Sequence, residues 1–68
     1  MSQFRTQEED IIEILRRHEA SVDRLRYTAI DVLSMRYPGM ARVDVVDRVL
    51  DLAAKGKLER KDGDWRVV

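Results

Sequence analysis

The sequence predicts an α+β domain that is mainly α, with three helices followed by a C-terminal two-stranded β-hairpin. Apolar residues recur at spacings of three and four in three segments, which is the pattern of one buried helix face. Near the C-terminus an Asp-Gly pair separates two short alternating segments, the strongest short-range signal for a hairpin. A chain of 68 residues is long enough for one domain only. We therefore expect residues 1–68 to form a single domain in which residues 1–5 are flexible.

The first predicted helix begins at the sequence TQEE. Thr6 followed three residues later by Glu9 is the pattern of a capping box, in which each side chain accepts a hydrogen bond from the other residue's backbone N–H. The buried stripe that follows consists of Ile11, Ile14, Leu15 and His18. A lone histidine on such a stripe is typical of a packing or capping residue, so we expect neither a metal ligand nor a catalytic base at His18.

The second predicted helix opens at Ser21 or Asp23, because both residue types are good N-caps. Its expected buried side comprises Leu25, Ala29, Ile30, Leu33 and Tyr37. The helix ends at Tyr37, since Pro38 disfavours helical geometry in the residue before it and Gly39 permits a turn.

The third predicted helix covers residues 41–55, with Gly56 just beyond its end. At 100° per residue its apolar side chains span an arc of about 200°, well beyond the usual stripe of about 100°. We expect the core to use Val43, Val46, Val49, Leu50 and Ala53. Val45 and Leu52 extend the arc on one flank, and we expect at least one of them to be exposed. The opposite, outward side carries Asp44, Asp47 and Asp51.

The hairpin has one favoured register if Asp62 and Gly63 form a two-residue type I′ loop. The facing pairs are then Leu58 with Val67, Glu59 with Arg66, Arg60 with Trp65, and Lys61 with Asp64. Alternation places the two apolar-rich pairs on one face, where the Arg60 guanidinium can lie on the Trp65 indole. The other face receives two pairs of opposite charge.

The join LAAKGKLER, from the last turn of the third helix into the first strand, and the return strand WRVV resemble the winged helix-turn-helix superfamily. The resemblance extends from about Thr6 to Val68 and implies a three-helix domain with the hairpin as its wing. Members of this superfamily include DNA readers and protein-docking modules. In the DNA readers the third helix enters the major groove and the tip of the hairpin contacts phosphate. Here three aspartates against Arg48 and Lys55 would repel phosphate along that helix.

Composition excludes several classes of function. Thirteen basic and thirteen acidic residues give a formal net charge of zero, so no general attraction to nucleic acid or anionic lipid is expected. There is no cysteine, no apolar run near the roughly 20 residues of a membrane span, and no secretory signal in MSQFRTQEED. The sequence also shows no phosphate-binding loop and no catalytic constellation. We therefore expect a cytoplasmic, non-enzymatic protein without cofactor, metal or small-molecule substrate.

Two functions in different classes remain. The favoured one is a protein–protein docking or regulatory module, with Val45 and Leu52 meeting a partner protein or a second copy of the chain. The alternative is a DNA-binding transcription regulator of the nucleoid, with contacts from Arg42, Arg48, Lys57 and Lys61. Arg42 and Lys57 are the leading phosphate contacts in that alternative, because neither has an evident acidic partner in the sequence.

Overall fold

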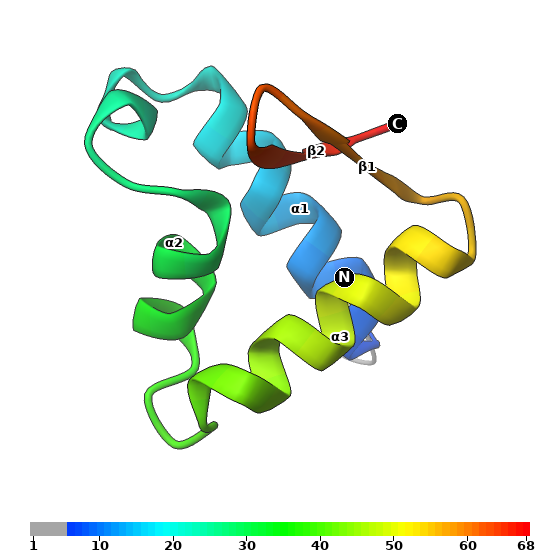
Figure 1. Ribbon diagram of the computed structural model, residues 1–68. Coiled ribbons are helices and arrows are strands. Elements are labelled where there is room, and N and C mark those ends of the chain that lie inside the picture. The colour runs from blue at the N-terminus through cyan, green and yellow to red at the C-terminus, as the bar shows by residue number, and fades with distance from the viewer. Residues whose placement is uncertain (1–5) are drawn as a thin grey trace.

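The computed structural model describes residues 6–68, so the flexibility expected of residues 1–5 lies outside the described part. The elements in chain order are α1 (Gln7–Ala20), the 3₁₀ helix η1 (Val22–Leu25), α2 (Ala29–Arg36), α3 (Arg42–Ala54), β1 (Leu58–Lys61) and β2 (Asp64–Val67). In Figure 1, α3 crosses in front of α1, α2 lies to one side, and the hairpin lies above α3. The fold is mainly α with a small antiparallel sheet, as predicted.

The first helix starts where its cap predicts. The Thr6 side chain accepts a hydrogen bond from the Glu9 backbone N–H at 3.2 Å, so Thr6 is the N-cap of α1. Three side chains of the predicted stripe are buried: Ile11, Leu15 and His18. The fourth, Ile14, is half-buried and packs against the edge of the core.

The second helix is shorter than predicted, because the helical conformation is interrupted between η1 and α2. Ser21 caps η1, and Thr28 is the N-cap of α2 in an extended conformation (φ −75°, ψ 163°) that interrupts the helix. Thr28 and Asp31 form a capping box, each side chain accepting from the other residue's backbone N–H at 3.2 Å. Leu25, predicted on the buried side, is 87% exposed, so that expectation is wrong.

The third helix ends as predicted, with Lys55 at the C-cap and Gly56 at a φ of +78°. Its core face differs from the prediction. Val45 and Leu52 are only 2% and 1% exposed, whereas Val43 and Leu50 are 65% and 48% exposed. The expectation of an exposed Val45 or Leu52 is therefore wrong. Because α3 packs against α2 and β1, the sector centred on Val45, Val49 and Leu52 is turned inward.

The hairpin has the predicted register in all four pairs. Asp62 and Gly63 have φ values of +54° and +80°, as a type I′ turn requires. The Arg60 guanidinium lies 5.8 Å from the centre of the Trp65 ring, which confirms the predicted stacking.

A single cluster of buried hydrophobic side chains joins the helices to the hairpin. Its members are Ile11, Leu15, Ala29, Leu33, Val45, Val49, Leu52 and Leu58. Trp65 and Val67 pack against this cluster from β2, which also contacts α1 and α2. The hairpin therefore closes one side of the helical core. No helix within residues 6–68 combines the length and the apolar character needed to cross a bilayer.

Candidate functional site

The outward side of α3 carries exposed apolar and acidic side chains together. We call this surface the α3 face and define it by Val43, Asp44, Asp47, Leu50 and Asp51, all of which are exposed. Val43 and Leu50 are seven residues apart, so they lie on the same side of the helix two turns from each other. The three aspartates run beside them at spacings of three and four, so the α3 face combines an apolar stripe with an acidic stripe.

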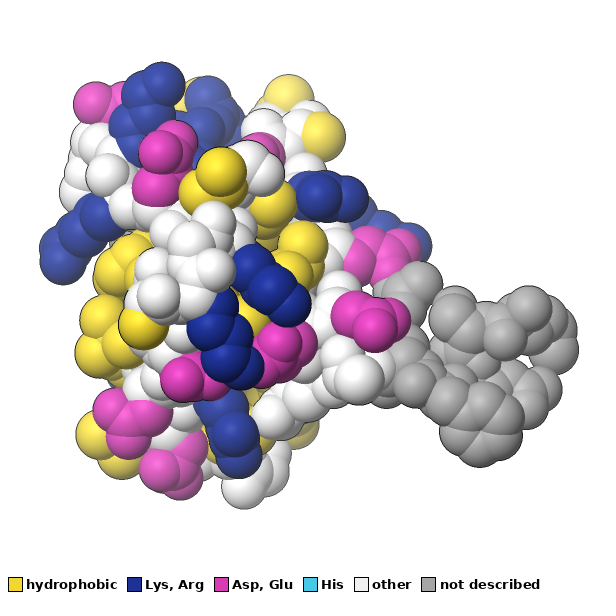
Figure 2. Space-filling view, turned by 90° about the vertical axis from the view of Figure 1, so that its right-hand side faces the viewer, with side chains coloured by type: hydrophobic (Ala, Val, Ile, Leu, Met, Phe, Trp, Pro, Cys, Tyr) yellow, Lys and Arg dark blue, Asp and Glu magenta, His cyan; other side chains and the backbone are white. Residues whose placement is uncertain are grey.

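Few cations neutralise the α3 face. Asp51 forms an ion pair with Lys55, four residues later on the same helix side, at 3.2 Å. Lys55 is also bonded to Glu8 of α1, which raises the pKa of Lys55, mainly through that hydrogen bond. Within residues 6–68, Asp44 and Asp47 take part in no ion pair, although Arg48 follows Asp44 at the i,i+4 spacing that permits one. Figure 2 shows hydrophobic side chains gathered along one edge of the molecule, with acidic side chains next to them.

The residues predicted to contact a protein partner, Val45 and Leu52, do not reach the surface. Both belong to the buried core, where they share the inward side of α3 with Val49. The large apolar residues that α3 does expose are Val43 and Leu50, which the sequence pattern places in the core. The width of the apolar arc is a signal for such exposed residues. A helix that packs against the rest of the domain on one side only must leave part of an arc this wide in solvent.

Two of the four predicted DNA contacts have acidic partners within the chain. Arg42 pairs with Asp31 at 2.8 Å, and Lys57 lies 3.4 Å from Glu8, so the expectation that both lacked partners is wrong. The pKa of Asp31 is lowered, first by the hydrogen bond from the Thr28 side chain and then by Arg42. The pKa of Glu8 is also lowered, with the hydrogen bond from Lys55 as its largest cause.

The other two predicted DNA contacts, Arg48 and Lys61, are exposed and form no ion pair in the described part of the chain. They lie on different elements, Arg48 in the middle of α3 and Lys61 at the end of β1. Positive and negative side chains are interspersed over the face shown in Figure 2. On that face the Lys and Arg side chains do not merge into a broad, continuous basic region.

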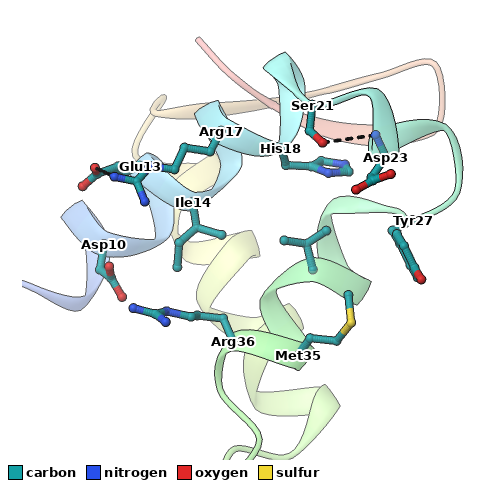
Figure 3. A pocket seen from close by; sticks show the side chains of 11 residues that line it. Asp10, Glu13, Ile14, Arg17, His18, Ser21, Asp23, Tyr27, Met35 and Arg36 are labelled. Carbon is teal, nitrogen blue, oxygen red and sulfur yellow. Dashed lines mark hydrogen bonds and ion pairs between the residues drawn. The ribbon is translucent and has the colours of Figure 1, made fainter.

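A second surface feature is a groove of about 630 Å³ between α1, η1 and α2, which we call the α1–α2 groove. Its apolar lining consists of Ile14, Tyr27, Val32 and Met35. Its polar lining consists of Asp10, Glu13, Arg17, His18, Ser21, Asp23 and Arg36. In Figure 3, Ile14 extends from α1 toward the middle of the groove, while Tyr27 and Met35 lie on its far side.

His18, at one end of this groove, also lies close to Asp64 of the hairpin. Its side chain is only 3% exposed, and its Nε2 lies 3.6 Å from an Asp64 carboxylate oxygen. The other oxygen of Asp64 accepts hydrogen bonds from the backbone N–H groups of Ala29 and Trp65, both at 2.9 Å. The sequence paired Asp64 with Lys61 across the hairpin and did not reveal this role, because Ala29 is 35 positions away.

No group of three or more metal-binding side chains that could hold an ion is found in residues 6–68. No family model, no curated protein and no solved structure matches the chain.

Proposed function

We propose that the chain is a small non-enzymatic winged-helix module that docks to another protein through the α3 face. The observation that carries this proposal is the exposure of Val43 and Leu50 beside three exposed aspartates on one side of one helix. Adjacent exposed apolar side chains are unfavourable in water and typically mark a contact site. The order of three helices and a C-terminal hairpin supports the winged-helix assignment.

The charge of the α3 face defines the kind of partner. A complementary surface carries an apolar stripe for Val43 and Leu50 and a basic flank for the aspartates. A second copy of the chain docked face to face would bring the same acidic stripe against itself, because a two-fold contact uses the same patch on both copies. We therefore propose a different, basic protein segment as the partner, in a cytoplasmic setting.

The same acidic stripe argues against insertion of α3 into a DNA groove. Carboxylates at Asp44, Asp47 and Asp51 would lie near phosphates of the major groove, and Coulomb repulsion would weaken binding. An aspartate can accept a hydrogen bond from cytosine, but three carboxylates along one face also add repulsion from the phosphates. A protein partner can cover the apolar stripe and offer cations to the acidic stripe, whereas the phosphates of a duplex can do neither.

Photo-crosslinking in the native cell tests this proposal. A photoreactive amino acid replaces Ala54, which is exposed on α3, and the adducts are identified as protein or nucleic acid. We expect a protein adduct that disappears when Leu50→Glu is added. The matched control is Leu25→Glu, an equally polar change at an exposed leucine on another surface, which should leave the adduct in place. Adducts to nucleic acid, or a protein adduct that persists with Leu50→Glu, would contradict the proposal.

Duplex DNA binding through the hairpin is the second candidate function. The observation in its favour is that Lys61, near the tip of the wing, is exposed and outside the ion pairs of the described residues. If the wing binds phosphate, Lys61→Ala should reduce the dependence of affinity on salt by about one unit of slope. Arg42→Ala and Lys57→Ala should change that slope less, since Asp31 and Glu8 already compensate these cations. Fluorescence anisotropy of a labelled duplex at several salt concentrations measures these slopes.

A further inference from the structure

Two hydrophobic side chains of η1 project into solvent. Val22 is 84% exposed and Leu25 is 87% exposed, the highest values among the large hydrophobic residues that the structure exposes. A 3₁₀ helix has three residues per turn, so positions 22 and 25 lie on the same edge of η1. The pair therefore forms one apolar knob, which we call the η1 knob.

The α1–α2 groove opens directly beside this knob. Ser21 and Asp23, which flank Val22 in the sequence, both line the groove. Figure 3 shows Ser21 and Asp23 at one end of the groove, joined by a hydrogen bond, with the side chains of Ile14, Tyr27 and Met35 further along. Met35 is 58% exposed, so apolar surface is accessible on the groove side as well. One side of the molecule thus carries an apolar knob and an apolar groove next to each other.

The charges of the knob and the groove are opposite in balance. Arg24 and Arg26 flank Leu25, and neither forms an ion pair within residues 6–68. The groove lining contains three carboxylates, Asp10, Glu13 and Asp23, against two guanidinium groups, Arg17 and Arg36. Arg17 is already bonded to Glu13 at 2.7 Å, so the remaining carboxylates face a single further cation. Asp23 belongs both to η1 and to the groove lining, so the attraction comes from Arg24 and Arg26 of one copy meeting Asp10 and Asp23 of the other.

We infer that two copies of the chain pair about a two-fold axis, each placing its η1 knob in the α1–α2 groove of the other. A two-fold contact requires one surface to be complementary to itself, and a knob adjacent to a matching groove has this property. The exchange makes two equal contacts and leaves neither knob exposed, so the assembly closes at two copies. The inference is independent of the α3 face, which remains available to a partner in the dimer.

Sedimentation over a range of protein concentrations tests the dimer. We expect the unmodified chain to associate to a dimer, and Leu25→Glu on the knob or Met35→Glu in the groove to give monomers. Both residues are exposed, so the variants should keep the circular dichroism spectrum of a folded chain. Leu50→Glu, on the α3 face, should leave the dimer intact. A chain that remains monomeric at all concentrations, or a dimer lost only with Leu50→Glu, would overturn the inference.

Disulfide trapping distinguishes the knob-in-groove arrangement from any other dimer. The chain contains no cysteine, so one introduced cysteine per copy reports on a single contact. Mild oxidation of a mixture of Leu25→Cys and Met35→Cys chains should give a covalent dimer of unlike copies. A mixture of Leu50→Cys and Met35→Cys chains is the control and should give much less. Equal trapping in the two mixtures, or trapping of neither, would show that the knob does not enter the groove.

Discussion

The carboxylate of Asp64 in β2 accepts a hydrogen bond from the backbone N–H of Ala29, the first residue of α2, at 2.9 Å. The same oxygen accepts from the Trp65 N–H, and the second oxygen lies 3.6 Å from Nε2 of the buried His18. The first N–H groups of a helix have no partner within the helix and favour negative charge nearby. Asp64 therefore attaches the hairpin to the beginning of α2 as well as to α1.

Removal of this carboxylate should destabilise the fold. We expect Asp64→Ala to lower the free energy of unfolding by about 1–2 kcal/mol. The partly buried N–H of Ala29 loses its acceptor, and the N-terminus of α2 loses a favourable negative charge. Asp64→Asn, which keeps an acceptor, should cost less. Urea unfolding followed by circular dichroism measures both. Glu59→Ala, at an exposed position on the neighbouring strand, is the control, and an equal loss there would mean that Asp64 acts only as a surface residue.

The orientation of α3 can be tested by truncating two leucines two residues apart. Leu52→Ala should cost about 2–5 kcal/mol, since it leaves a cavity in the core. Leu50→Ala should cost less than about 1 kcal/mol, because Leu50 is exposed and its truncation opens no cavity. Thermal or urea unfolding of the two variants compares them directly. The reverse order would restore the orientation that the sequence pattern alone favours.

Gly56 should resist substitution where Gly39 does not. Gly56 has a φ of +78° just after α3, a conformation in which a Cβ atom is strained even though no neighbour lies within 4 Å. We expect Gly56→Ala to cost about 1 kcal/mol. Gly39 has equally open surroundings and no such φ, so Gly39→Ala should be neutral or stabilising by a few tenths of a kcal/mol. Similar unfolding midpoints for the two variants would refute this reason for the glycine at position 56.

Tyr37 should make stability fall at alkaline pH. Its hydroxyl donates to a carboxylate oxygen of Asp10, and burial together with that hydrogen bond raises the pKa of Tyr37 to about 12, from 10.0 for a free side chain. The unfolded chain therefore loses the phenolic proton first as the pH rises. The stabilisation that the protonated Tyr37 gives the folded state is complete below pH 10 and is lost between pH 10 and about 12.

Tyr37→Phe separates this titration from that of other groups. The variant lacks the phenol, so its free energy of unfolding should fall less steeply across this pH window than that of the unmodified chain. We expect the difference in loss to be about 1–2 kcal/mol, less than the full shift implies because water partly screens the side chain. Urea unfolding at several alkaline pH values measures it. Parallel pH profiles for the two proteins would rule out Tyr37 as the source.

Local signals predicted the beginning of α1, the end of α3 and the whole hairpin. Thr6 caps α1 because its own side chain reaches the Glu9 N–H, and Gly56 ends α3 because its backbone accepts a positive φ. The break before α2 was also open to prediction, since Thr28 and Asp31 have the spacing of a capping box. It was missed because apolar spacing on either side of the break suggested one continuous helix. A periodic pattern does not reveal where a backbone conformation interrupts it.

The candidate site was less predictable than the fold. The width of the apolar arc correctly indicated that α3 leaves hydrophobic side chains in solvent, but Val43 and Leu50 occupy that position instead of Val45 and Leu52. The partners of Arg42 and Lys57 were equally hidden, because Asp31 and Glu8 belong to other helices. Both errors concern relations between elements that are distant in the sequence.

The hairpin register follows from local sequence alone, because Asp62-Gly63 sets the turn and alternation then assigns every pair. The spacing of the apolar residues in α3 likewise shows that this helix has more apolar surface than one core contact requires. Which sector of α3 is buried does not follow from the sequence pattern, since it depends on how the helix packs between α2 and β1. The physical reason is range: turn and cap geometry act over a few residues, whereas the orientation of a broadly apolar helix depends on the shape of neighbours folded from distant segments.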